Sequence, residues 1–304
     1  MVRISVIIPT RNRAADLRRC LDGLEESICE LPTGAVLHQV VVVDDASDSP
    51  EATAAARATG LPVTLLRNAV RTGAGASRRN AVRVADGDVL AFLDDDAVPR
   101  GDWLAMAARV DAGRPAVTGR VLGFDDGLIS RARQARYDAR YRGLSQGAPV
   151  RFFACGNGAV LTSAFHQVGG FSNEGVGGDN SLALSLDRAG TPVRFQPGLV
   201  IAHRNGKGWA AAVGNAWSAG TNHPERVPLA QLLDTARKSA VGNGLAVREL
   251  NRALGLLHAL GRVLPRTRDE DGDPPSSAHT DPAVPEQDRP ATATATGTSQ
   301  GSTR

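Results

Sequence analysis

The chain has 304 residues, 42% of them hydrophobic, which is enough apolar material for one large domain or two small ones and excludes a chain disordered throughout. No segment reaches the roughly 18 uninterrupted apolar residues that a membrane-spanning helix requires. Met1 leads straight into an apolar strand pattern without a signal-peptide pattern, so we expect a cytoplasmic protein. The three cysteines form no CxxC pair, which predicts reduced thiols.

The net charge of +3 is unevenly distributed along the chain. Residues 266–304 hold four arginines and seven acids, a net charge of −3, which leaves +6 for the rest. A modest positive excess suits an anionic ligand such as a nucleotide diphosphate. It is too small for the dense basic stripes of nucleic-acid-binding proteins, so we expect no nucleic-acid partner.

The first hundred residues alternate β-branched runs with helical patterns. Strands are expected at 4–8, 40–43, 63–66 and 89–93, and helices at 14–26 and 77–85. This alternation predicts an α/β fold with a Rossmann-like, mostly parallel sheet flanked by helices. Ligands of such sheets bind at the carboxyl ends of the strands.

Later segments predict further elements. Trp103 is expected in the core, and packing is also favoured for Trp209 and Trp217. Apolar residues at helical spacing predict amphipathic helices within 226–264, which are candidates for a membrane-surface contact at the inner face of the membrane or for a homodimer. Residues 265–304 carry no aromatic residue and are expected to form a disordered tail.

Polar residues follow three neighbouring strands of the predicted sheet. Pro9-Thr10-Arg11 follows the first strand, Asp44-Asp45 the second, and Asp94-Asp95-Asp96 the fourth. Three successive carboxylates repel one another unless a cation lies between them, and a divalent metal is the economical explanation. The alternative is a solvated acidic turn that caps a helix starting near Asp102.

These motifs occur in a recognisable order: SVIIPTRNR, VVVVDDAS, GAGASRRNAV and FLDDD. From Val2 to Arg204 the chain resembles inverting family 2 glycosyltransferases with the GT-A fold. The resemblance implies that Asp45 bonds the nucleotide base, that Pro9 and Arg11 border its pocket, and that Arg79 lies near the nucleotide. It further implies a DxD motif that binds Mg²⁺ or Mn²⁺, with Asp96 as the direct ligand. The donor-binding residues that it implies are Pro9, Thr10, Arg11, Asp45, Arg79, Asp94 and Asp95.

Three residues further along the chain complete the expected site. Asp179 matches the family's catalytic base, although Gly178 stands where many relatives have glutamate; the alternative is a helix N-cap. His203 resembles a histidine that completes the metal shell in some relatives, with a plain hydrogen-bonded role as the alternative. Asn157 is expected on the acceptor side, unless it only tolerates a left-handed turn.

Together these features predict a metal-dependent inverting glycosyltransferase, with a UDP-sugar as the default donor and GDP- and dTDP-sugars open. We expect a GT-A domain over 1–225, with a donor half at about 1–115 and an acceptor half at about 116–225. The 4% aromatic content argues against a long polysaccharide groove, so a small-molecule, lipid-linked, peptide or glycan acceptor stays open.

Two other functions stay open. A nucleotidyltransferase that makes sugar nucleotides usually carries a glycine-rich, lysine-bearing loop after its first strand, where this chain has PTRNR. A non-catalytic sugar-nucleotide or glycan-binding module is kept open by the missing glutamate beside Asp179.

Overall fold

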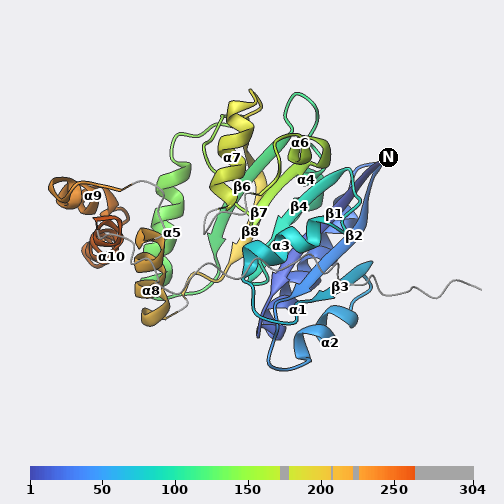
Figure 1. Ribbon diagram of the computed structural model, residues 1–304, viewed down its shortest axis with the longest axis horizontal. Coiled ribbons are helices and arrows are strands. Elements are labelled where there is room, and N and C mark those ends of the chain that lie inside the picture. The colour runs from blue at the N-terminus through green and yellow to red at the C-terminus, as the bar shows by residue number, and fades with distance from the viewer. Residues whose placement is uncertain (172–177, 207, 222–225, 264–304) are drawn as a thin grey trace, which may run out of the picture. The chain divides into compact units, whose positions relative to one another are not determined.

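The computed structural model describes residues 1–171, 178–206, 208–221 and 226–263. These residues form one eight-stranded sheet with helices on both faces (Figure 1). The strand order is β3-β2-β1-β4-β7-β6-β8-β5. The strands are β1 (Val2–Thr10), β2 (Ala35–Asp44), β3 (Val63–Arg67), β4 (Val89–Leu93), β5 (Ala97–Pro99), β6 (Ala116–Gly123), β7 (Asn157–Leu161) and β8 (Arg194–His203).

The first four strands pair in parallel, as the alternating pattern predicts. The other half of the sheet is mixed. Strand β7 runs antiparallel to β4 and to β6, while β6 and β8 are parallel and β5 is antiparallel to β8. The expectation of a mostly parallel sheet therefore holds for the amino half, where each strand is followed by a helical crossover.

Within the described ranges there are also ten α-helices and two short 3₁₀ helices. They are α1 (Ala14–Glu26), η1 (Ser27–Glu30), α2 (Glu51–Arg57), α3 (Ala74–Val82), α4 (Trp103–Ala107), α5 (Leu128–Tyr141), α6 (Thr162–Gln167), α7 (Gly178–Arg188), α8 (Trp209–Thr221), η2 (Leu229–Gln231), α9 (Leu232–Ser239) and α10 (Leu245–Val263). No helix of the described residues is long and apolar enough to cross a membrane.

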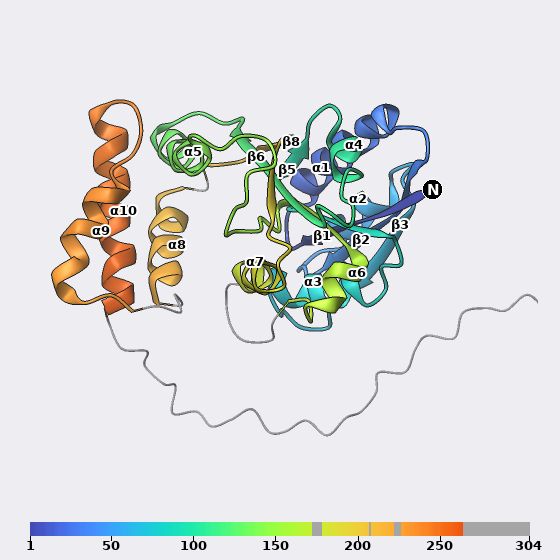
Figure 2. The same cartoon turned by 90° about the horizontal axis from the view of Figure 1, so that it is seen from above.

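Alternation along β1 divides the core between the two faces of the sheet. Ile8 points toward α1, where it belongs to one apolar cluster with Leu17. Ile7 points the other way and clusters with Ala81 of α3. Helices α1, α2 and α4 therefore cover one face and α3, α6 and α7 the other (Figure 2). Trp103 is fully buried, as predicted.

Strand β8 bulges where it runs beside β6. Thr118 pairs with Phe195 and Arg120 with Val200, so the intervening residues of β8 loop out. Gly119 lies at this point, and a Cβ there would come within 1.8 Å of the Leu199 carbonyl oxygen. Only glycine allows the two backbones to approach so closely.

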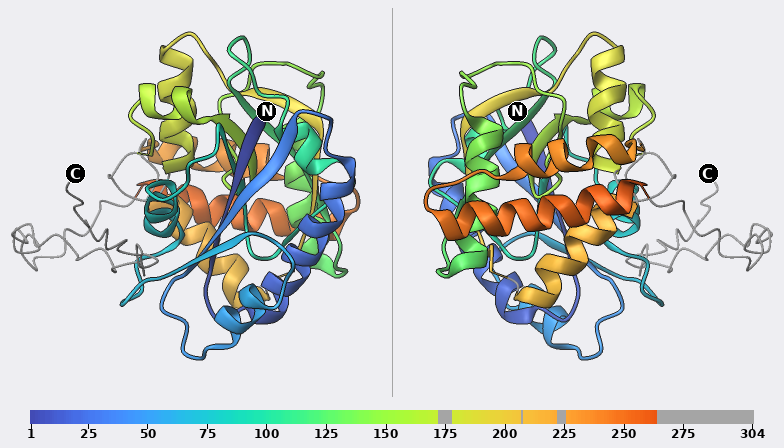
Figure 3. Two further views of the ribbon diagram at one scale, coloured as in Figure 1. Left: turned by 90° about the vertical axis from the view of Figure 1, so that its right-hand side faces the viewer. Right: turned by 90° about the vertical axis from the view of Figure 1, so that its left-hand side faces the viewer.

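The helices after the sheet pack on one another and on α5. Helix α10 contacts α5, α8 and α9 (Figure 3). Its turn at His258 lies against Gly220 of α8. The prediction that Trp209 and Trp217 are packed in the interior is wrong, because these two residues of α8 are 57% and 38% exposed. With Val213 they form an exposed stripe at i, i+4 and i+8, while Ala216 and Gly220 are the buried residues of α8. The predicted tail lies outside the described residues.

We predict that Gly119→Ala strongly destabilises the fold. The added methyl group collides with backbone, which cannot move aside as a flexible side chain would, and such overpacking costs about 1–3 kcal/mol or more. Gly214→Ala is the matched control, because a Cβ on Gly214 of α8 meets nothing within 4 Å. Urea denaturation should show a clear loss for the first variant and no loss for the second, since alanine favours a helix over glycine by about 1 kcal/mol. Equal stability of the two variants would contradict the close approach.

Candidate active site

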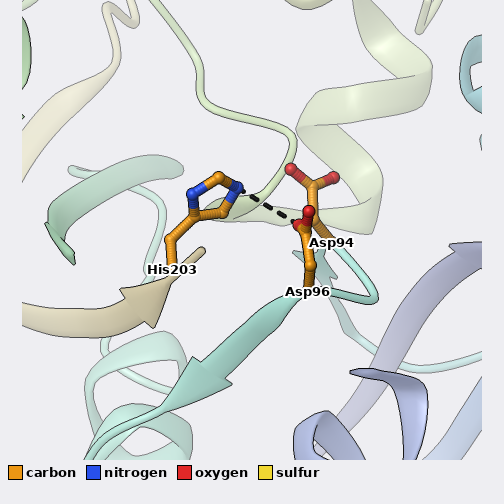
Figure 4. A group of neighbouring side chains, drawn as sticks. All are labelled: Asp94, Asp96 and His203. Carbon is orange, nitrogen blue, oxygen red and sulfur yellow. Dashed lines mark ion pairs between the residues drawn. The ribbon is translucent and has the colours of Figure 1, made fainter. Parts of the chain in front are cut away.

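A group of three side chains that could hold a metal ion, called here the metal-ligand group, lies beyond the end of β4. Asp94 and Asp96 follow that strand directly, and the pairing of Ala97 in β5 with His203 in β8 brings the histidine to the same place. One ligand atom from each of Asp94, Asp96 and His203 lies within 4.8 Å of the others (Figure 4). The His203 Nε2 atom is 3.1 Å from Asp96 Oδ1. The structure thus brings together three residues that the sequence predicted for donor or metal binding.

Two arginines pair with the acidic turn. The Arg13 guanidinium lies 2.9 Å from Asp95 Oδ1 and 3.2 Å from Asp96 Oδ2, and Arg78 pairs with Asp94. Burial raises the pKa of Asp95 to about 6, although the Arg13 charge and a hydrogen bond from Thr10 act against this shift. The three carboxylates therefore exceed the two guanidinium charges by one, which leaves room for a further cation.

The residues at this turn fit a divalent ion. Two carboxylates and an imidazole form a hard, mixed oxygen and nitrogen donor set of the kind that binds Mn²⁺, and carboxylates also suit Mg²⁺. The Nδ1 atom of His203 lies 3.2 Å from Asn205 Oδ1. We assign the proton to Nδ1, which donates to this amide oxygen, so Nε2 keeps a lone pair toward the carboxylates.

The loop after β8 is anchored at the same point. Asp125 accepts a 2.6 Å hydrogen bond from the Asn205 backbone nitrogen and another from Gly206. The amide nitrogen of Asn205 also donates to Gln134 of α5 at 3.1 Å. Asn205 is 1% exposed, so its amide holds the His203 ring in a fixed orientation.

Asp45 organises the loop between β3 and α3. Its Oδ1 atom accepts hydrogen bonds from the Asn68 amide at 2.8 Å and from the Thr72 backbone and hydroxyl at 2.8 and 2.9 Å, and its Oδ2 atom accepts one from the Gly73 backbone at 2.8 Å. Burial alone would raise the pKa of this carboxyl, but the hydrogen bonds from Thr72, Asn68 and Gly73 together lower it to about 2.

The remaining predicted donor residues line the same edge of the sheet. Pro9 and Thr10 are buried at the end of β1, and Thr10 donates a 2.9 Å hydrogen bond to Asp95. Arg11 pairs with Asp48 at 3.5 Å. Arg79 is half-buried on α3, but its neighbour Arg78 makes the ion pair with the acidic turn.

Arg13 and Arg78 were not singled out from the sequence. Both belong to motifs that carried the prediction, PTRNR and GAGASRRNAV, and the need of three carboxylates for counter-charges was the available signal.

Asn157 has a structural place that differs from the expected one. Its side chain is fully buried at the start of β7, in an extended strand rather than a left-handed turn. Its Oδ1 accepts from Trp103 Nε1 at 2.8 Å, and its Nδ2 donates to the carbonyls of Arg120 and Leu199 at 2.9 and 3.0 Å. These bonds leave the Asn157 amide without a free donor or an exposed surface. The expectation that Asn157 contacts the acceptor is therefore wrong.

Asp179 is the second residue of α7, and its side chain lies outside the described residues.

The sequence profile of glycosyl transferase family 2 matches residues 5–169, more than half of the chain. The chain therefore belongs to glycosyl transferase family 2. A pre-mycofactocin glycosyltransferase of Mycobacterium tuberculosis is 27% identical over 242 residues, covering 73% of this chain and 48% of that protein. The chain thus spans about half the length of this curated relative.

Solved structures share the fold. The mannosyltransferase PcManGT from Pyrobaculum calidifontis, in complex with GDP-Man and Mn²⁺, has a TM-score of 0.54 at 22% identity and covers 86% of this chain and 74% of its own. GalNAc-T7 with UDP, GalNAc and Mn²⁺ has a TM-score of 0.53 at 16% identity, covering 84% of this chain and 54% of its own. The predicted GT-A fold is confirmed.

The hydrogen bonds of Asp45 predict a pH dependence of stability. A carboxyl whose pKa is lowered by folding stabilises the protein at pH values above its unfolded pKa of about 3.9, and the contribution is lost as pH falls through the folded value. We expect Asp45→Asn to be destabilised relative to wild type at neutral pH and the difference to shrink between about pH 4 and pH 2. Free energies of unfolding across pH measure it. A difference independent of pH would contradict the assignment.

Proposed function

We propose that the protein is a metal-dependent inverting glycosyltransferase that moves a sugar from a nucleotide-diphosphate sugar to an acceptor hydroxyl. The observation that carries this proposal is the group of Asp94, Asp96 and His203 at the carboxyl end of β4 in a chain of family 2. The two similar structures hold GDP-Man or UDP together with Mn²⁺, which supports the donor class. GDP-mannose and UDP-sugars are therefore the first donors to test.

Asp94, Asp96 and His203 would hold the divalent ion, and the chain's own cations set their geometry. Such an ion, when bound, neutralises charge that builds on the departing nucleoside diphosphate. Arg13 pairs with one oxygen of Asp96, while the other oxygen faces His203. Arg78 orients Asp94 in the same way. Preorganised ligands lose little freedom on binding, so these residues would hold an ion without first rearranging.

The donor's base is proposed to lie beside Asp45. The loop bonds three times to Oδ1 but once to Oδ2, and a carboxylate oxygen can accept about two hydrogen bonds. Oδ2 therefore retains room for a ring N–H of uracil or guanine. Pro9, Thr10 and Arg11 would border this pocket, with Arg79 near the nucleotide.

We also propose a division of labour along the chain. Residues 1–115 form the donor half, and residues 116–225 complete the catalytic site and receive the acceptor. The helices within 226–264 follow as a separate segment. Support comes from the position of the acidic turn between the two halves, because β4 pairs with β1 on one side and β7 on the other.

We predict that Asp96→Asn abolishes most Mn²⁺-dependent donor binding and release of nucleoside diphosphate. The variant loses a charged ligand that both His203 and Arg13 contact, and a neutral amide binds hard cations weakly. Calorimetry with GDP-mannose or UDP-glucose measures binding, and product release measures hydrolysis in the absence of an acceptor.

The matched control is Asp22→Asn, an exposed aspartate on α1 that pairs only with Arg18 among the described residues. Wild-type protein that binds donor but never releases nucleoside diphosphate would favour a binding module. Unchanged affinity in Asp96→Asn would show that this buried carboxylate has only a structural role in the turn.

Asp179 is proposed as the general base, because inversion requires the acceptor hydroxyl to lose its proton as it attacks the anomeric carbon. The match of Asp179 to the family's catalytic-base aspartate supports this role, although Gly178 replaces the glutamate that many relatives have before it. A positioned base contributes about 10²–10⁴-fold in rate, so Asp179→Asn should lower turnover by about that factor and spare donor affinity. Asparagine caps a helix about as well as aspartate, so a purely structural residue would tolerate the change. Near-normal transfer by the folded variant contradicts the proposal.

A further inference from the structure

A cavity of about 530 Å³ is walled by α5, α8 and α10. Its volume is in the range of small-molecule sites, which is about 300–1,000 Å³. The three helices lie next to one another, with α10 in contact with both of the others (Figure 3). The cavity is therefore large enough for a molecule of the size of a sugar or larger, and not only for a single ion.

The α5 wall of this cavity is strongly cationic. Arg133, Arg136 and Arg140 are spaced at i, i+3 and i+7, so they project from one face of the helix. The residues of the described chain that line the cavity include no aspartate or glutamate. No described carboxylate lies within ion-pair distance of these three arginines either. The wall thus has three positive charges without a counter-charge among the described residues.

Two of the three arginines lie against aromatic rings. Arg133 lies 5.8 Å from the centre of the Tyr137 ring, and Arg140 lies 5.0 Å from that of Phe152. Surrounding protein, followed by the charges of Arg140 and Arg133, lowers the pKa of Arg136. Its side chain is nonetheless exposed to water, which screens part of this repulsion. An anion in the cavity would relieve the repulsion, and the planar arginine fork suits phosphate and carboxylate.

The cavity adjoins the metal-ligand group. Asn205 lines the cavity and is 3.2 Å from the His203 ring nitrogen. Tyr137 also lines it, and its ring contacts that of His203 edge-on at 6.5 Å. The donor's base is proposed to lie beside Asp45, which follows β2. In the sheet, four strands (β1, β4, β7 and β6) separate β2 from β8, which carries His203. An occupant of the cavity is therefore on the acceptor side.

We propose that this cavity binds the acceptor and that the acceptor carries a phosphate or carboxylate group, which Arg133, Arg136 and Arg140 bind. The proposal rests on the proposed glycosyltransferase function, because only a transferase needs a second substrate beside the metal-ligand group. Small and apolar side chains of α8 and α10, including Ala212, Ala216 and Leu254, face the rest of the acceptor. The anion-bearing molecule can be soluble or a lipid whose headgroup enters the cavity.

The test measures binding of glucose 6-phosphate by calorimetry and of vesicles containing phosphatidic acid by sedimentation, without metal. We expect the double variant Arg136→Gln, Arg140→Gln to bind either anion at least tenfold more weakly than wild type. The control, Arg131→Gln with Arg142→Gln, removes the same charge from exposed positions of the α5 region outside the cavity lining and should bind as wild type does.

The outcomes separate the inference from the function on which it rests. Preference for glucose 6-phosphate identifies a soluble acceptor, and preference for vesicles a lipid-linked one. Failure of the wild type to bind either probe, or equal weakening in both double variants, overturns the cationic cavity as an acceptor site. Metal-dependent donor hydrolysis, measured on wild type alone, tests the transferase function independently. Because the substitutions remove like charges, melting temperatures at or above wild type are expected, which confirms that the variants are folded.

Discussion

The candidate site depends on how three consecutive carboxylates are held in one short turn. Asp95 and Asp96 are each 4% exposed, and buried charge of one sign is costly unless opposite charge is close. Arg13 directly precedes α1, which covers one face of the sheet. Arg78 lies in α3, which covers the other face. The turn therefore ties both helical layers to the end of β4. Its geometry is set by the packing of the whole amino half rather than by the turn itself.

The histidine reaches this turn from a distant part of the chain. His203 ends β8, whose antiparallel pairing with β5 fixes its position beside Asp96. Asn205 and Asp125 then fix the ring and the following loop. The matched family segment ends at residue 169, so His203 and the α8 and α10 walls of the cavity lie beyond it, whereas the three arginines of α5 lie within it. The amino half can provide the proposed donor contacts, whereas His203 and two of the three walls of the proposed acceptor cavity come from the later segment.

Much of the amino half could be predicted from the sequence, because its signals are local. Continuous β-branched runs predict buried parallel strands, and the polar residues after them must meet at one edge. The choice between Arg78 and Arg79 could not be made this way. It depends on the rotation of α3 about its axis, which the packing of Ala81 and Val82 against the sheet determines.

The structural role of Asn157 could not be predicted from the sequence either. It arises from a bulge in β8 that turns the Leu199 carbonyl toward it, and no spacing in the sequence reports this bulge.

Helix α5 went unnoticed because it contributes little to the core. Only Ser130, Ala132 and Tyr141 are buried among its fourteen residues. Its position is held largely by polar contacts, such as the amide of Asn251 in α10, which donates to the Ala132 carbonyl at 2.9 Å. Helix propensity does not explain the arginines of α5 either, because lysine and glutamate favour a helix about as well as arginine does. Its arginines line a cavity beside the metal-ligand group, so binding of an anion, rather than core packing, explains why they lie on this face of α5.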